Sequence, residues 1–214
     1  HGAYPQTTKD PIVLASAIVM RLQTLISREN SPFEPGVVTV GSFHAGAKHN
    51  IIPDEARLQL TVRSYSDDQR KLLLDGIRRI AAGEAMASGV PQDRMPTVSV
   101  LDPYTRATLN PPAFSQRVLA DMKRQFGEDG AVQTPPVMAG EDFGEFWRTD
   151  PDHMGATIFW VGGRPASELD AAKREGRALP SLHSPFWAPE ADKVIAAGAE
   201  ALASEAMRLM PKGD

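Results

Sequence analysis

The chain has 214 residues, of which 42% are hydrophobic and 23% are charged, so it can bury one large core or two small ones. Its formal net charge of -4 offers no basic field for phosphates, and we therefore expect no nucleic-acid partner. A sequence without cysteine cannot form disulfides, a catalytic thiolate or cysteine-ligated zinc, and it is compatible with the cytoplasm as well as with the periplasm or secretion.

The first predicted element is an amphipathic helix over residues 11–28. Asp10 is a good N-cap residue, and Pro11 suits the first helical position. Apolar side chains then recur at helical spacing, at Ile12, Leu14, Ile18, Leu22, Leu25 and Ile26. The longest apolar run, 12–20, is too short to span a bilayer, so we expect no membrane association.

Two strands are expected next, over 37–43 and 56–62. In the second strand apolar and polar residues alternate, as in a sheet with one buried face, and Arg63 continues the polar series. Ser66 is predicted to cap a helix that runs to about Met86. The buried stripe of this helix would carry Leu73, Ile77, Ile80 and Ala81. A further strand is expected over 97–101.

The predicted order α-β-β-α-β in residues 1–106 lacks only a leading strand to complete the βαββαβ arrangement of a ferredoxin-like domain. We expect that strand to lie before His1, because the sequence also begins without an initiator methionine. The segment 102–112 is rich in helix breakers and predicts a boundary between this domain and a second one, 107–214.

Residues 107–214 are predicted to be the C-terminal remainder of an α/β domain. We expect a helix over 113–126 and a short apolar strand over 156–161. The polar segment 164–179 is predicted to be a mobile loop beside a site. A last helix should start at Pro189, with Ile195, Leu202, Ala206 and Leu209 on its apolar stripe.

Five separate sequence blocks follow one another along the chain. They are His1 to Gln6 with Asp10 to Ile12, His49 to Asp54, Thr61 to Arg63, Gly140 to Phe143, and Leu182 to Phe186. Together they resemble the di-metal (zinc) amidohydrolases and metallopeptidases, which include aminoacylases, hippurate hydrolases, auxin-conjugate amidohydrolases and related carboxypeptidases. The resemblance covers nearly the whole chain and corresponds to the C-terminal part of the family. It implies an α+β lid for dimerisation over 1–106 and the end of a zinc-peptidase-like α/β domain over 107–214.

The resemblance also implies a role for two histidines. His183 matches a metal-ligand histidine near the C-terminus of the family. His1 matches a catalytic lid histidine that reaches into the active site of the partner subunit and polarises the scissile carbonyl. From the residues alone, a single histidine before Ser-Pro is more often a loop residue than a ligand, because a catalytic zinc needs about three protein ligands.

Substrate contacts are implied for three residues of the lid and its neighbouring blocks. Asn50 and Arg63 match residues that grip the substrate, and a guanidinium suits a carboxylate. Gly140 would allow close approach of the substrate, with Glu141 and Asp142 as active-site neighbours of unassigned role. The structural alternative for Arg63 is a solvated arginine or half of a weak ion pair. For Glu141 and Asp142 it is an N-cap and first-turn role in a short helix over 143–148.

The implied reaction is hydrolysis of the amide bond of an N-acyl amino acid or small peptide by a metal-activated water. Two zinc ions per intact subunit are implied, with manganese or cobalt as alternatives. The other metal ligands and the general-base glutamate lie upstream in the family, so we expect the isolated chain to be inactive. The competing hypothesis is a non-catalytic dimerisation or binding module that retains the motifs. Both hypotheses predict a homodimer through the lid.

Overall fold

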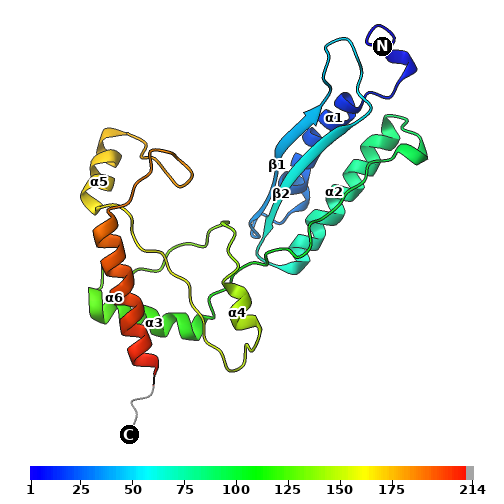
Figure 1. Ribbon diagram of the computed structural model, residues 1–214. Coiled ribbons are helices and arrows are strands. Elements are labelled where there is room, and N and C mark those ends of the chain that lie inside the picture. Colours follow the sequence, from blue (N-terminus) through cyan, green and yellow to red (C-terminus); the bar gives the residue numbers. More distant parts are fainter. Residues whose placement is uncertain (211–214) are drawn as a thin grey trace. The chain divides into compact units, whose positions relative to one another are not determined.

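The computed structural model describes residues 1–210, which divide into two compact units (Figure 1). The first unit comprises residues 1–107 together with 136–142. The second comprises residues 108–135 and those from 143 onward. A domain boundary at residue 106 stays a prediction, and nothing in the sequence indicated that 136–142 would join the first unit.

The elements of the first unit are, in chain order, η1 (Pro5–Thr7), α1 (Pro11–Thr24), η2 (Leu25–Glu29), β1 (Gly36–Ala45), β2 (Ala56–Ser64), α2 (Asp67–Ala87) and η3 (Gln92–Arg94). Both predicted helix starts are confirmed. A side-chain oxygen of Asp10 accepts a hydrogen bond of 2.8 Å from the Ile12 amide, and Pro11 opens α1. The Ser66 hydroxyl accepts one of 3.2 Å from the Gln69 amide at the start of α2. These caps satisfy amides that have no partner inside the helix.

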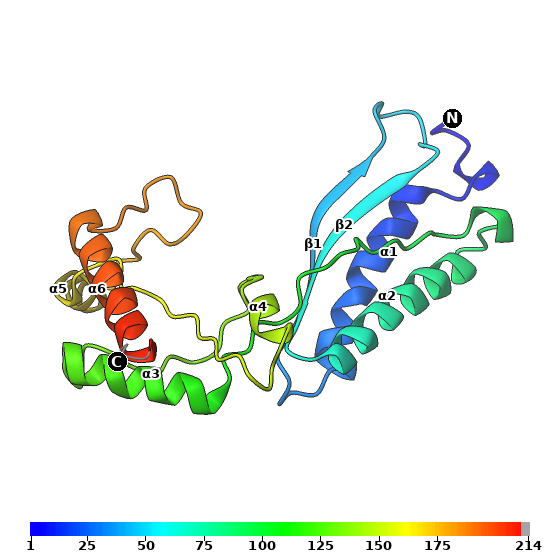
Figure 2. The same ribbon diagram turned by 60° about the horizontal axis from the view of Figure 1, so that its bottom comes forward.

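α1 and α2 lie on one face of the β1–β2 hairpin and enclose the core of the first unit (Figures 1 and 2). The largest fully buried side chains are those of Leu22, Leu25 and Leu73. Of the stripe predicted for the first helix, Ile12 lies outside the core and is 39% exposed. The four residues predicted for the stripe of α2 are all buried.

The hairpin is antiparallel and carries a bulge at Gly41. Val40 pairs with Leu60, but the next pairs are Ser42 with Gln59 and Phe43 with Leu58. Because the bulge inserts one residue, Phe43 stays on the same face as Leu58. The opposite face carries the polar residues of β2, and Arg63 lies on it as predicted.

α1 with η2 is long and apolar enough, by length and composition, to cross a membrane. Its residues Ala15, Ile18, Leu22 and Leu25 are nevertheless buried within the protein. We therefore interpret this segment as a core helix of the first unit.

The strand predicted over 97–101 is wrong. Within the described residues the sheet contains β1 and β2 only. Val98 packs against the core, whereas Val100 and Leu101 are exposed. A strand also needs a hydrogen-bonded neighbour for its backbone groups, and no described strand pairs with this segment.

The elements of the second unit are α3 (Pro112–Phe126), α4 (Gly144–Arg148), α5 (Ala166–Glu175) and α6 (Ala191–Leu209). Its core forms where α3 meets α6, around Val118, Met122 and Ala201, with Phe114, Phe126, Ala131 and Phe159 packed at the edge. α3 agrees with the predicted helix. The strand predicted over 156–161 is wrong, since no described strand pairs with it.

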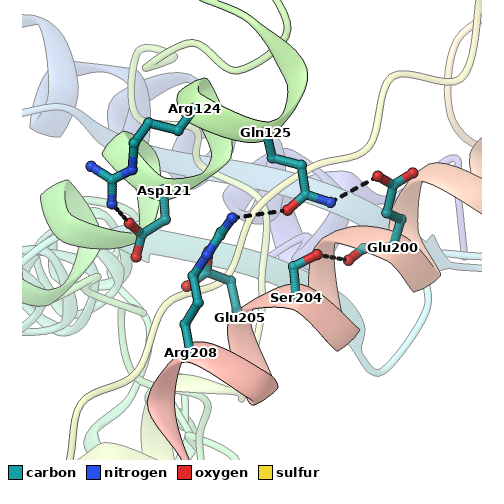
Figure 3. A network of polar contacts seen from close by, with 7 residues as sticks. All are labelled: Asp121, Arg124, Gln125, Glu200, Ser204, Glu205 and Arg208. Carbon is teal, nitrogen blue, oxygen red and sulfur yellow. Dashed lines mark hydrogen bonds and ion pairs between the residues drawn. The ribbon is translucent and has the colours of Figure 1, made fainter.

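The apolar stripe predicted for the last helix is also wrong. Ile195 and Leu202 are 69% and 62% exposed, whereas Ala201, Ser204 and Glu205 are buried. A polar network joins α6 to α3 in this orientation (Figure 3). Its hydrogen bonds run from the Gln125 amide to Glu200 at 2.8 Å and from Arg208 to the Gln125 oxygen at 3.3 Å.

The mobile loop predicted over 164–179 is in fact built around a helix, α5. Arg164 pairs with Glu168 at 2.6 Å, and Gly176 ends the helix with a φ of 62°. The many charges of this segment therefore belong to a helix surface with complementary spacing and a glycine stop.

Candidate active site

The backbones of residues 1–2 and Asn50 are joined by a hydrogen bond. The Gly2 amide donates to the Asn50 carbonyl oxygen at 2.8 Å. A Cβ atom on Gly2 would lie 3.0 Å from that oxygen, so only glycine allows this approach without a shift. Figures 1 and 2 both place the N-terminus beside the loop that joins β1 to β2. The structure thus brings His1 and Asn50 together, and both side chains are exposed.

The His1 ring is held by its own turn. The Tyr4 amide donates to the His1 carbonyl at 2.9 Å, and the Ala3 amide donates to His1 Nδ1 at 3.0 Å. The Tyr4 ring lies against the imidazole, with 5.2 Å between the ring centroids and an interplanar angle of 56°. The ring nitrogen Nδ1 is therefore occupied inside the turn.

Arg63 and Gly140 are also brought together, within the first unit. Arg63 Nη1 donates to the carbonyl oxygen of Met138 at 2.8 Å. A Cβ atom on Gly140 would lie 3.3 Å from the same nitrogen. Arg63 is half-buried and held by a backbone oxygen, so the alternative of a freely solvated arginine is wrong. The sequence did not predict the contact between Arg63 and Met138, because no local pattern links residues 75 positions apart.

The short helix considered for 143–148 is present as α4 (Gly144–Arg148). The N-cap position belongs to Phe143, and the Gly144 amide donates to the Thr108 hydroxyl at 3.3 Å. Glu141 is half-buried and Asp142 is exposed. Their place near an active site stays a prediction.

His183 occupies a strained backbone position in a tight turn. The Ser184 amide donates to the Ser181 carbonyl at 3.0 Å, and His183 has a φ of 70°. Non-glycine residues rarely adopt this conformation, which concentrates at functional sites. The His183 side chain is exposed rather than buried in an apolar core, so it remains accessible to a ligand.

Residues 1–87 match the family model of the peptidase dimerisation domain, of the M20 type. Over 189 residues the chain is 35% identical to the N-acetyldiaminopimelate deacetylase of Leuconostoc mesenteroides, covering 86% of this chain and 46% of that protein. The chain is therefore similar to part of an M20 hydrolase, and its residues 1–87 match the dimerisation domain. These matches confirm the resemblance and the α/β class expected from the five blocks.

Two further M20 relatives extend the comparison. Over 147 residues the chain is 35% identical to the hippurate hydrolase of Campylobacter jejuni, covering 68% of this chain and 37% of that protein. The crystal structure of the Bacillus subtilis YXEP protein, a dinuclear metal binding peptidase from the M20 family, has the same fold with a TM-score of 0.63 at 21% identity. The structural match covers 94% of this chain and 47% of the YXEP chain. The matches thus span 46%, 37% and 47% of the lengths of the deacetylase, the hippurate hydrolase and the YXEP protein.

Within one M20 dimerisation domain, the two pairs of candidate residues lie far apart. His1 and Asn50 lie at the loop that precedes β2, whereas Arg63 lies near the other end of this strand. A strand rises about 3.3 Å per residue, so the steps from Ala56 to Arg63 span roughly 20 Å. One small substrate cannot touch both pairs in a single subunit.

The described residues do not supply the ligands of a dinuclear metal site. Residues 1–210 contain no group of three or more histidine, cysteine, aspartate or glutamate side chains that could hold a metal ion. His183 by itself falls short of the roughly three protein ligands of a catalytic zinc. The described residues therefore do not fit a complete metal centre on their own.

Proposed function

We propose that this chain is part of a metal-dependent M20 amidohydrolase that cleaves the amide bond of an N-acyl amino acid or small peptide. The observation that carries the proposal is the Gly2–Asn50 hydrogen bond, which joins two candidate residues, His1 and Asn50, that are far apart in the sequence. The names of the relatives, a deacetylase of N-acetyldiaminopimelate and a hydrolase of hippurate, support an N-acylated amino acid as the substrate class.

His1 is the proposed donor to the scissile carbonyl. Attack on an amide carbon moves negative charge onto the carbonyl oxygen, and a donor that is already in place stabilises this charge more than it stabilises the substrate. The exposed imidazole can reach a substrate outside its own subunit. Asn50, which is held beside it, would supply an amide to the same part of the substrate.

Arg63 is the proposed partner of the substrate carboxylate. A guanidinium has five N–H donors, and the bond to the Met138 carbonyl fixes one edge while other donors remain. Gly140 has no side chain to fill the space beside Nη1, where a Cβ atom would lie only 3.3 Å away. A carboxylate could therefore approach the guanidinium from this side.

The roughly 20 Å span of β2 between the two pairs supports an active site that is shared by two subunits. In a two-fold dimer, the His1 end of one dimerisation domain can meet the Arg63 end of the partner. We therefore propose a homodimer in which each site combines His1 and Asn50 of one subunit with Arg63 and Gly140 of the other. The match of residues 1–87 to a dimerisation domain supports this arrangement.

Divalent metal ions, zinc first and manganese or cobalt as alternatives, would supply the activated water of this reaction class. The dinuclear metal binding of the YXEP protein supports two metal ions. His183 would contribute one imidazole, and the other ligands would have to come from outside the described residues. The lack of a three-ligand group in residues 1–210 also favours the second candidate function, a non-catalytic dimerisation or binding module.

Mixed dimers of the intact protein test the proposal. A His1→Ala subunit and an Arg63→Ala subunit are each expected to form inactive homodimers. After mixing, half of the dimers are heterodimers with one intact site in two, so about a quarter of the wild-type amidase activity should return. Mixed dimers without activity would contradict the shared site. An intact wild-type protein that hydrolyses no N-acyl amino acid with added zinc, manganese or cobalt would favour the binding module.

A further inference from the structure

We infer that the turn at residues 1–4 selects the tautomer of His1, with the Ala3 amide and Gly2 acting as positioning groups. A neutral imidazole has one N–H and one lone pair, so one ring nitrogen donates and the other accepts. A backbone amide can only donate. The Ala3 amide lies 3.0 Å from His1 Nδ1, and this nitrogen must therefore accept, which places the ring proton on Nε2.

This tautomer is the one that a carbonyl polariser requires, and here the inference rests on the proposed function. A histidine that stabilises an oxyanion must present an N–H, not a lone pair. Nε2 is the ring nitrogen farther from the backbone, while Nδ1 is engaged inside the turn. The turn therefore leaves the outer nitrogen as the donor before any substrate arrives.

Gly2 fixes the position of the turn relative to Asn50. Its amide bonds to the Asn50 carbonyl at 2.8 Å, and the Tyr4 amide closes the turn on the His1 carbonyl at 2.9 Å. A Cβ atom on Gly2 would meet three backbone atoms of Asn50, the oxygen at 3.0 Å, the carbonyl carbon at 3.2 Å and Cα at 3.3 Å. Backbone atoms cannot rotate away as a side chain can. A side chain at position 2 would therefore displace His1, Asn50 or both.

His153 provides an internal comparison for the tautomer of His1. His153 Nδ1 lies 2.8 Å from Oδ1 of Asp150. An ionised carboxylate only accepts hydrogen bonds, so Nδ1 of His153 must carry a proton. The geometry thus assigns opposite roles to Nδ1 in His1 and in His153. His44 and His49, which are exposed, serve as references for an imidazole in solvent.

Long-range 1H–15N correlation of the 15N-labelled chain 1–214 at alkaline pH tests the inference, because the two ring nitrogens of a neutral imidazole have distinct shifts in each tautomer. The His1 signals are identified by their loss in His1→Ala. We expect a single Nε2–H tautomer for His1, protonated Nδ1 for His153, and a 15N–15N coupling across the hydrogen bond from Ala3 to His1. A His1 tautomer ratio equal to that of His44 and His49, with no such coupling, would overturn the inference.

Two variants separate the positioning role from the proposed function. Ala3→Pro removes the amide proton, and Ala3→Gly keeps it as the matched control. In the intact enzyme Ala3→Pro should lower kcat about tenfold or more at nearly unchanged KM, whereas Ala3→Gly should retain most of kcat. If the spectra show the expected tautomer but Ala3→Pro and His1→Ala both keep full kcat, His1 has no catalytic role and the proposed function of His1 fails. The wild-type spectrum decides the tautomer even if Ala3→Pro does not fold.

Discussion

The side chain of Asn110 pairs with the backbone of Ile158 through two hydrogen bonds. Its oxygen accepts from the Ile158 amide at 2.8 Å, and its amide donates to the Ile158 carbonyl at 2.8 Å. The amide side chain thereby takes the place of a neighbouring strand at this residue. The pair also joins the segment before α3 to the extended segment that contributes Phe159 to the core.

Asn110→Ala should destabilise the second unit by about 1–3 kcal/mol, because both backbone groups of half-buried Ile158 lose their partner. Amide hydrogen exchange of Ile158 should accelerate, and urea unfolding should give the change in free energy. Gln116→Ala, an exposed polar substitution on α3, is the matched control with an expected change within about 0.5 kcal/mol. Unchanged exchange at Ile158 would contradict the role of Asn110.

The helices with strong local signals could be predicted from the sequence. Asp10 and Ser66 make the predicted capping bonds, and the stripe of α2 is buried as expected. These features depend on residues a few positions apart, so a short stretch of sequence contains the whole cause. The apolar segments 97–101 and 156–161 were predicted as strands because their composition indicates burial, but composition does not reveal whether a hydrogen-bonding neighbour exists.

The candidate site residues came from the five blocks, and their role in a site stays a prediction. The blocks indicated His1, Asn50, Arg63 and Gly140, but not the contacts that these residues make. The bonds from Gly2 to Asn50 and from Arg63 to Met138 join residues 48 and 75 positions apart. Such contacts follow from the packing of the whole unit, which no local pattern encodes.

Arg63→Lys in the intact protein should raise KM for an N-acyl amino acid about tenfold or more, because a lysine cannot form the bidentate contact of a guanidinium. The preference for the free acid over its uncharged carboxamide should fall by the same factor. Arg57 lies on the same face of β2 but is exposed beside Glu55. The control substitution Arg57→Lys should therefore leave KM unchanged. Retention of the acid preference in Arg63→Lys would exclude Arg63 as the carboxylate partner.

Removal of divalent metal should not alter the thermal stability of the isolated chain. Residues 1–210 contain no three-ligand group, so a metal ion has no complete site whose binding could stabilise the folded state. We expect equal Tm values with zinc and with a chelator, and His183→Ala should behave in the same way. A chelator-dependent fall in Tm that disappears in His183→Ala would instead reveal a metal site around His183.

Neighbouring substitutions in α6 distinguish its buried face from the stripe predicted by periodicity. Ala201 is 5% exposed in the core with Val118 and Met122, whereas Leu202 is 62% exposed. Ala201→Glu should cost about 2 kcal/mol or more, because it inserts a charge into a packed interface. Leu202→Glu should change the unfolding free energy by less than about 0.5 kcal/mol, because Leu202 is exposed. Urea unfolding measures both changes in free energy. A larger loss of stability for Leu202→Glu than for Ala201→Glu would restore the periodicity-based orientation of this helix.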